Sequence, residues 1–276
     1  MGSSRDVGGT PRTADTGTRA ATTIGVGASA ANVDVPSLIA HRGFAGENPE
    51  NTVSTLRTAA TVADWIEIDC RPTADDVCVV FHDPVLDRCT DLSGAVAETP
   101  VATVLSAEVD GGGSIPAFEE VLDAVPSNTG LVLDLKGRHA EDPDDECWEW
   151  LADPLAAAAG AANPVLVSTF SEDALEAVEE HAPALPTAYL CKRDIDRALD
   201  VARRRGCAAI HPSTGLLFGG SDGDPERNPL ARAHEAGLAV HAWTVSDTKE
   251  AAALAALGVD GLIADYADVL DSVERR

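Results

Sequence analysis

From residue 36 onward, short apolar runs alternate regularly with longer helical stretches, and this alternation constrains the fold most strongly. Strand-like runs cover 36–41, 65–69, 77–82, 130–135, 164–168, 186–190, 208–211, 238–243 and 260–264. Helix-like stretches cover 52–63, 116–125, 145–161, 171–181, 194–205, 228–236, 247–257 and 266–275. Strands that alternate with helices are typical of α/β proteins with a parallel sheet.

The third strand-like run cannot be a parallel neighbour of the second. A parallel connection needs about a dozen residues, but only seven separate Asp69 from Val77. Setting residues 72–112 aside as an insertion after strand 2 leaves eight strand–helix units, which predicts a (β/α)8 TIM barrel. We therefore expect one barrel domain over residues 35–276 that carries this small insertion at its C-terminal mouth.

The first 34 residues are rich in Thr, Ala, Gly and Ser and lack an apolar period. Such a segment buries too little surface to offset the entropy of ordering, so residues 1–34 are predicted to be a disordered N-terminal extension. No stretch reaches the ~18 apolar residues of a membrane helix, and a signal-peptide core is also missing. We therefore expect a cytoplasmic protein without stable membrane insertion.

The chain is strongly acidic, with 46 acidic against 20 basic residues and a formal net charge of −26. The acids are spread along the sequence, so we interpret the charge as a solvated surface adapted to high salt, as in a halophile. In ~1 M salt the screening length of ~3 Å weakens the repulsion between such charges. A cationic partner is the alternative interpretation, and nucleic acid is not expected as a partner.

The cysteines at positions 70, 78, 89, 147, 191 and 207 form no Cys-x-x-Cys pair and no cluster with zinc spacing. Several lie in apolar strand-like runs, where a free thiol behaves as a small hydrophobic group. We expect reduced core cysteines. A disulfide between Cys70 and Cys78, which flank a tight turn, is the alternative.

Three short segments hold the side chains with the strongest chemistry. His41 and Arg42 directly follow an apolar strand end, which places an acid–base group beside an anion-binding guanidinium. Glu67 and Asp69 point to the same side of the next strand because side chains alternate with period two. Two carboxylates on one strand face favour a divalent cation between them. A second histidine, His82, follows the strand-like run of the insertion.

Together these segments resemble the glycerophosphodiester phosphodiesterase family, which has His-Arg-Gly, Pro-Glu-Asn, Glu-x-Asp and His-Asp motifs in this order. This sequence carries them at 41–43, 49–51, 67–69 and 82–83. The resemblance continues through 115–122, 133–136, 168–170, 243–245 and 258–263, and it covers roughly residues 37–270.

The resemblance implies one bound divalent metal ion, Mg²⁺ or Ca²⁺, with Glu67, Asp69 and Asp134 as ligands. Asp134 departs from the family, which usually has glutamate at the matching position. Because aspartate is one methylene shorter, the identity of the ion and its affinity stay open. By the same resemblance His41 and His82 form the acid–base pair, and the sequence does not assign the acid and the base.

The remaining candidates bind the substrate. The resemblance assigns Arg42 to catalysis and phosphate binding, and Glu50 to the neighbourhood of metal and substrate. Lys136 supplies a positive charge on the strand of Asp134. Trp243 is expected to form a wall of the glycerol pocket, with a core position as the alternative. Two further histidines, at positions 211 and 241, lie near strand ends, whereas Phe170 is interpreted as packing.

We expect metal-dependent hydrolysis of small-molecule glycerophosphodiesters to sn-glycerol 3-phosphate and an alcohol. One alternative is a phosphodiesterase for lysophospholipids or ether lipids, which exposed apolar residues in the 72–112 or 212–228 loops would favour. Another is a non-catalytic barrel that binds metal or phosphate, with Asp134 as a mark of decay. The sequence leaves the preferred head group and the oligomeric state open.

Overall fold

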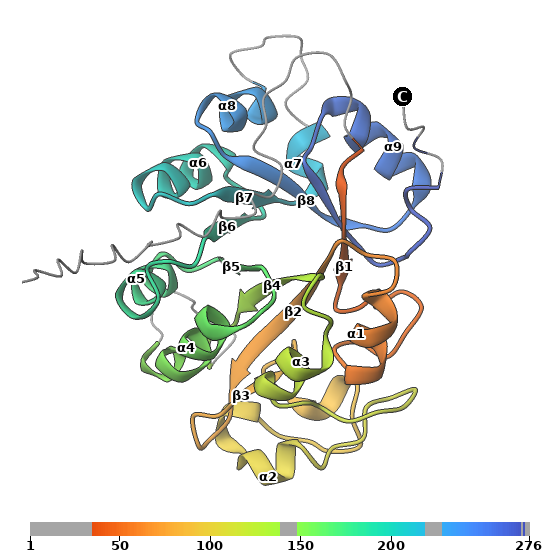
Figure 1. The fold of residues 1–276 in the computed structure, drawn as a ribbon, viewed down its shortest axis with the longest axis vertical. Helices are drawn as coiled ribbons and strands as arrows, with labels where there is room; N and C mark the ends of the chain where they lie inside the picture. Colours follow the sequence, from red (N-terminus) through yellow and green to blue (C-terminus); the bar gives the residue numbers. More distant parts are fainter. Residues whose placement is uncertain (1–34, 139–147, 219–227, 272, 274–276) are drawn as a thin grey trace, which may run out of the picture.

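The chain forms a closed barrel of parallel strands with helices around it (Figure 1). The computed structural model describes residues 35–138, 148–218, 228–271 and 273. Neighbouring strands follow the order β1-β9-β8-β7-β6-β5-β4-β2, and pairing of β1 with β2 closes the ring, which confirms the predicted (β/α)8 fold. The strands are β1 (Ser37–His41), β2 (Trp65–Pro72), β4 (Gly130–Leu135), β5 (Val165–Thr169), β6 (Thr187–Cys191), β7 (Ala209–Pro212), β8 (Ala239–Val245) and β9 (Gly261–Ala264).

The helices between the strands lie close to their predicted positions, except for the short helix over Thr214–Phe218, which lies in a segment expected to be a loop. They are α1 (Val53–Ala59), α3 (Phe118–Ala124), α4 (Ala152–Gly160, preceded by a 3-10 turn at Glu149–Leu151), α5 (Glu172–His181), α6 (Ile195–Arg204), α7 (Thr214–Phe218), α8 (Pro229–Glu235) and α9 (Thr248–Leu257). The longest of them have ten residues, and none in the described ranges is long and apolar enough to span a bilayer.

The predicted helix over 266–275 is wrong for the part that the structure describes, because residues 267–271 form turns. Contacts with the β1–α1 loop hold this segment: the backbone N–H of Ala267 donates to Glu47 Oε1 (2.7 Å). The ring of Tyr266 also packs so closely on Gly46 that a Cβ there would lie 2.5 Å from it. The N-terminal extension 1–34 and the first residues of the helix expected over 145–161 lie outside the described residues.

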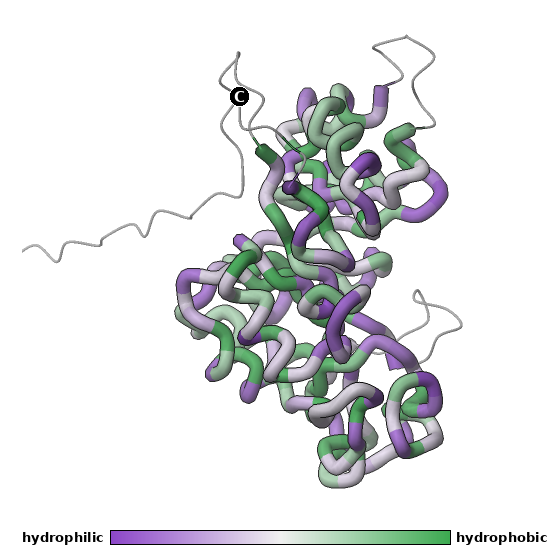
Figure 2. The backbone as a smooth tube through the Cα atoms, turned by 90° about the vertical axis from the view of Figure 1, so that its right-hand side faces the viewer, coloured by the Kyte–Doolittle hydropathy of each residue, from purple (hydrophilic) through white to green (hydrophobic). Residues whose placement is uncertain are grey.

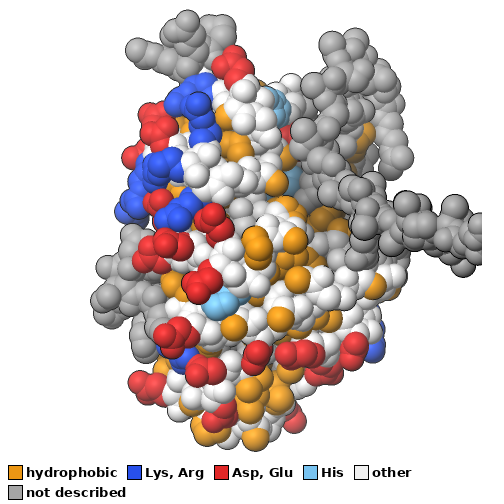
Figure 3. Space-filling model, turned by 60° about the vertical axis from the view of Figure 1, so that its left-hand side comes forward, with side chains coloured by type: hydrophobic (Ala, Val, Ile, Leu, Met, Phe, Trp, Pro, Cys, Tyr) orange, Lys and Arg blue, Asp and Glu red, His pale blue; other side chains and the backbone are white. Residues whose placement is uncertain are grey.

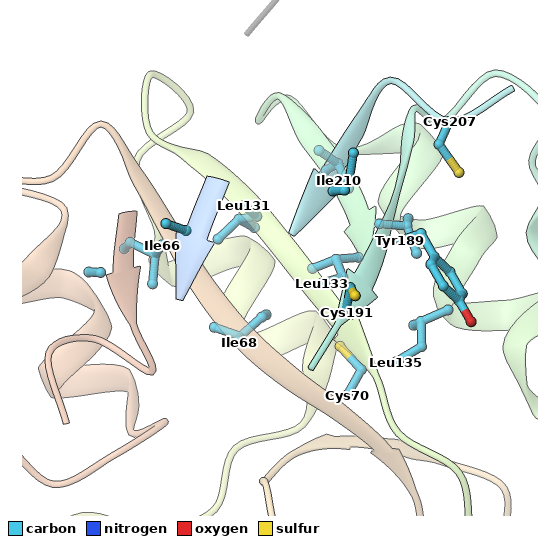
Figure 4. Packing of buried hydrophobic residues seen from close by; sticks show 14 of the residues in the cluster. Ile66, Ile68, Cys70, Leu131, Leu133, Leu135, Tyr189, Cys191, Cys207 and Ile210 are labelled. Atoms are coloured by element: carbon cyan, nitrogen blue, oxygen red, sulfur yellow. The ribbon is translucent and has the colours of Figure 1, made fainter. Parts of the chain in front are cut away.

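Side chains alternate across the barrel wall, and this alternation makes the site. On β2, Ile66, Ile68 and Cys70 belong to the apolar layer between strands and helices, where Figure 4 shows them beside residues of β4 and β6. Glu67 and Asp69 therefore face the barrel interior. Below them the interior is filled by a small apolar layer of Ile39, Val132, Leu166, Ala188, Ala209, Ala239 and Ile263.

The insertion after β2 folds against the mouth of the barrel. Its strand β3 (Cys78–Val80) pairs antiparallel with the end of β2, and the short helix α2 (Val101–Val104) follows in the yellow segment of Figure 1. The segment has its own apolar cluster, which includes Phe81, Leu86 and Val104. The fold thereby places the loop after β3 over the strand ends.

The surface carries the charge that the composition requires. Figure 3 shows acidic side chains spread over one face, together with a group of basic ones. Along the backbone, hydrophobic stretches alternate with hydrophilic ones (Figure 2). The cysteines at 70, 78, 89, 191 and 207 are free thiols in buried positions, so the alternative disulfide between the first two is not formed, and Cys147 lies outside the described ranges.

Candidate active site

A cavity of about 210 Å³ opens at the C-terminal ends of the barrel strands. Its ionic side comes from β1, β2, β4 and the insertion, and its other side comes from β5 to β9. The ionic side consists of His41, Arg42, Glu67, Asp69, His82, Asp134 and Lys136. The structure thus brings nearly all of the predicted site residues to one cavity.

Three carboxylates form the centre of the ionic side. Strand register aligns His41 with Glu67 and Asp69 with Asp134, so neighbouring strands present their acids at one level. One oxygen from each of the three carboxylates lies within 4.8 Å of the others, and all three residues are buried. Since β2 continues to Pro72, Glu67 and Asp69 occupy the middle of their strand rather than its end.

Two basic side chains neutralise part of this acidic centre. Lys136 Nζ lies 2.5 Å from Asp134 Oδ2 and 3.1 Å from Asp69 Oδ1, and Arg42 Nε lies 3.2 Å from Asp69 Oδ2. Burial acts to raise the pKa of Asp69, but these two cations outweigh burial and hold it well below its usual range. Asp69 is therefore ionised, and Asn51 also donates to it (2.8 Å).

For Glu67, burial and neighbouring charges shift the pKa upward, in the opposite direction to that of Asp69. Burial and the neighbouring charge of Asp69 raise its pKa to about 8, so without a bound cation Glu67 holds a proton near neutral pH. Asp134 Oδ1 is buried and lacks a hydrogen-bond partner among the described residues. A buried carboxylate oxygen without a partner is costly, and hard oxygens of this kind are the ligands that Mg²⁺ and Ca²⁺ prefer. The residues therefore fit a divalent cation.

His41 is held by a carboxylate from the far end of the chain. Its Nδ1–H donates to Asp265 Oδ1 at 2.6 Å, and its Nε2 lies 4.0 Å from Glu67 Oε2. Burial lowers the pKa of His41, but the hydrogen bond to Asp265 and the nearby carboxylates outweigh burial and raise the pKa above the usual 6.5. The bond to Asp265 fixes the ring so that Nε2 faces the acidic centre.

His82 is held in the same manner from the insertion. Its Nδ1–H donates to Asp83 Oδ1 (2.5 Å), and its backbone carbonyl accepts from Arg71 (2.8 Å). Burial lowers the pKa of His82 below 6.5 despite the charge of Asp69. Asp83 is in turn ion-paired with Arg88.

Arg88 connects the two histidine-bearing loops. Besides Asp83, it contacts Glu50 of the β1–α1 loop, with Nη2 2.5 Å from Oε1 and Nη1 3.1 Å from Oε2. Glu50 also accepts from Arg42 Nη1 (3.3 Å). Glu50 is not among the residues that line the cavity, and its carboxylate is shared between Arg42 and Arg88.

The loop after β1 is held in an unusual backbone conformation. Arg42 has φ +51°, which non-glycine residues adopt at a cost. Two hydrogen bonds from its backbone N–H to Glu67, one to the carbonyl (3.0 Å) and one to Oε2 (3.1 Å), support this geometry. Thr52 then caps α1 by accepting from Thr55 N–H, so a stable helix start anchors the end of the loop.

The other side of the cavity combines apolar and polar residues, and two of them, Phe170 and Lys192, were not predicted to line it, whereas His211 was a candidate lining residue. Trp243 lines it as expected, and Phe170, interpreted from sequence as packing, meets the Trp243 ring edge-on and also lines the cavity. Lys192 stands at the exposed rim directly after β6, and His211 lies on the floor. Of the cavity-lining residues that sequence reasoning missed, Lys192 could have been predicted, since it is one of only three lysines and directly follows a predicted strand.

A TIM barrel whose mouth combines three carboxylates, two basic side chains and two oriented histidines has the groups that a hydrolase of phosphate esters needs. The chain belongs to the glycerophosphoryl diester phosphodiesterase family, whose model matches residues 41–269.

Relatives and solved structures agree with this assignment. The glycerophosphodiester phosphodiesterase of Bacillus subtilis is 29% identical over 261 residues, which cover 86% of each chain. YhdW of the same organism is 30% identical over 244 residues, 84% of this chain and 96% of YhdW. A phosphodiesterase of Oleispira antarctica, solved with its product sn-glycerol-3-phosphate, superposes with a TM-score of 0.72 at 26% identity. The superposition covers 86% of this chain and 98% of the Oleispira antarctica chain.

Proposed function

We propose that this chain hydrolyses glycerophosphodiesters to sn-glycerol 3-phosphate and an alcohol, with a divalent cation held by Glu67, Asp69 and Asp134. The observation that carries the proposal is the buried acidic centre between two oriented histidines at the barrel mouth. The product bound to the Oleispira antarctica relative supports the choice of substrate.

Charge balance supports a divalent cation together with a phosphodiester. The three carboxylates carry three negative charges when ionised, and Lys136 and Arg42 carry two positive ones. A divalent cation would leave one net positive charge, which the single negative charge of a phosphodiester matches. Such a cation would polarise a phosphoryl oxygen and stabilise the charge that develops on it.

Arg42 and Lys136 are proposed to bind the second non-bridging oxygen of the phosphodiester. Nε and Nη1 of Arg42 already contact Asp69 and Glu50, so its Nη2 would meet the substrate, whereas Lys136 presents a point charge. Both side chains are mostly buried, with exposed fractions of 14% and 15%, so their charges act with little screening by water. Trp243 and Phe170 would enclose the carbon skeleton of the substrate.

His41 and His82 are proposed to move the protons. Nε2 of one histidine accepts a proton from the attacking water while the oxygen of that water bonds to phosphorus. The other donates a proton to the alcohol oxygen as the bond between that oxygen and phosphorus breaks. Asp265 and Asp83 hold the two Nδ1 atoms, so in each neutral ring Nε2 is the atom left for the reaction.

A metal titration tests the site independently of turnover. After treatment with EDTA, calorimetric titration with Mg²⁺, Ca²⁺ or Mn²⁺ at pH 7 should show one ion per chain. Binding should release close to one proton, because Glu67 holds a proton until the cation arrives. The released proton is measured by repeating the titration in buffers with different ionisation enthalpies.

The matched variants are Glu67→Gln in the cavity and Glu119→Gln on the exposed start of α3. We expect Glu67→Gln to lose the proton release and to bind the ion at least about tenfold more weakly, while Glu119→Gln behaves as wild type. Equal binding and equal proton release in Glu67→Gln would contradict the metal site.

A further inference from the structure

Two buried histidines, one of which lines the cavity, have no part in the proposed proton transfers. His211 on β7 and His241 on β8 lie side by side in the barrel wall, and both are fully buried. His241 Nδ1 is 3.0 Å from His211 Nε2, and the two ring centroids are 4.9 Å apart. Only His211 of the two lines the cavity.

The surrounding chain is shaped to hold this pair. The backbone carbonyl of His211 accepts from Trp243 Nε1 at 2.6 Å, which ties the end of β7 to the cavity wall. Gly261 on β9 leaves room for the ring of His241, because a Cβ there would lie 2.8 Å from His241 Cδ2. The rings therefore have defined positions.

Two nitrogens of the pair, His211 Nδ1 and His241 Nε2, lack a hydrogen-bond partner among the described residues, and of the two residues His211 lines the cavity. His211 Nδ1 is buried and forms no hydrogen bond with any residue in the described ranges. Leu190, which lies beside His211 on the neighbouring strand β6 and also lines the cavity, is apolar and cannot supply one. A buried polar atom without a hydrogen bond destabilises the protein by about 1–3 kcal/mol, and a ligand group that forms this hydrogen bond would recover that free energy.

The pair restricts which ligand group is suitable. A single proton lies between His241 Nδ1 and His211 Nε2, and either atom can carry it. If His241 Nδ1 carries the proton, the neutral ring of His211 has its own proton on Nδ1, which is then a donor. If His211 Nε2 carries the proton, His211 Nδ1 is an acceptor. Of the groups in a glycerophosphodiester, a hydroxyl serves both cases, because it donates and accepts. A charged group is disfavoured in this buried, apolar part of the cavity.

We infer that His211, held by His241, binds a hydroxyl of the substrate's glycerol moiety and makes the enzyme selective for glycerol esters over other phosphodiesters. The inference rests on the proposed function. It assigns the deep apolar side of the cavity to glycerol, which all glycerophosphodiesters share, and leaves the rim near Lys192 to the variable alcohol.

The test compares ligands with and without the hydroxyls. Dissociation constants for sn-glycerol 3-phosphate and for propyl phosphate are measured by calorimetry in saturating Mg²⁺, for wild type, His211→Leu and His211→Asn. Asparagine places a polar atom near the position of Nδ1, whereas leucine does not. Wild type should prefer sn-glycerol 3-phosphate, and His211→Leu should reduce that preference about 10- to 100-fold. His211→Asn should retain most of it.

An equal preference in wild type and His211→Leu would overturn the inference, and so would a wild type that binds both ligands equally. If the variants fail to fold, ¹⁵N-histidine NMR of wild type decides: the Nδ1 signal of His211 should shift with sn-glycerol 3-phosphate but not with propyl phosphate. An unchanged signal overturns the inference. Failure of the proposed function is a separate result, namely wild type that binds the product but does not hydrolyse glycerophosphocholine.

Discussion

Replacing His241 should change how the stability of the barrel depends on pH. Burial lowers the pKa of His241 from 6.5 to about 4. In the unfolded chain this histidine takes up a proton as the pH falls through 6.5, whereas in the folded chain it stays neutral until about pH 4. Protonation therefore favours unfolding throughout this window. Between pH 7.5 and 5 the linkage lowers the free energy of unfolding by about 2 kcal/mol, since each pH unit is worth about 1.36 kcal/mol.

Urea unfolding followed by tryptophan fluorescence measures this effect. His241→Asn keeps a polar atom near Nδ1 for His211 but does not titrate. Between pH 7.5 and 5 at constant ionic strength, both proteins should lose stability as the pH falls. The loss in the free energy of unfolding should be about 2 kcal/mol smaller for His241→Asn than for wild type. Measurements stop at pH 5 because the pI is near 4.4. Parallel pH curves for the two proteins would refute the reasoning.

His234 provides a matched control with the opposite sign. The bond from its Nε2 to Asp260 (2.9 Å) raises its pKa above 6.5. Its contribution to stability is therefore present below pH 6.5 and is lost as the pH rises through the folded-state pKa. The side chain is 42% exposed, so the contribution is at most about 0.5 kcal/mol. His234→Asn should lose a little stability at pH 5 and almost none at pH 9.

Two further predictions concern catalysis and packing. Asp265→Asn should lower kcat at least about 10²-fold with little change in metal affinity, because His41 loses the carboxylate that orients it; an unchanged kcat would remove Asp265 from the mechanism. Gly130→Ala should cost about 1–3 kcal/mol of stability, because the new Cβ would lie 2.2 Å from the Trp65 ring. Gly160→Ala, whose Cβ meets nothing within 4 Å, is the control, and equal melting temperatures for the two variants would contradict the packing argument.

Much of the fold follows from local sequence. The strands lie within one or two residues of the predicted runs at most ends, because a buried parallel strand requires a continuous apolar run. The short connection between Asp69 and Val77 excluded a parallel neighbour, and β3 is indeed antiparallel to β2. The helix expected over 266–275 failed because tertiary contacts of Tyr266 and Ala267 with the β1–α1 loop determine that segment.

The residues of the site could be predicted from motifs, but their mutual geometry could be predicted only where one strand carries the information. Glu67 and Asp69 are two residues apart, so their shared direction follows from strand geometry alone. The partner of His41 could not be found in this way, since Asp265 lies 224 residues away and meets it only when β1 pairs with β9. The same holds for Arg88, whose contacts with Glu50 and Asp83 depend on how the insertion docks.

The most direct test of the central claim is turnover of two glycerol phosphodiesters with different leaving groups. In saturating Mg²⁺ and molar KCl, wild type should release sn-glycerol 3-phosphate from glycerophosphocholine and from the p-nitrophenyl ester. His41→Ala and His82→Ala should each lose at least about 10²-fold on glycerophosphocholine. The variant that lacks the acid should keep most of its rate on the p-nitrophenyl ester, because that leaving group needs no proton. Near wild-type turnover of glycerophosphocholine by either variant, or none by wild type, would contradict the account.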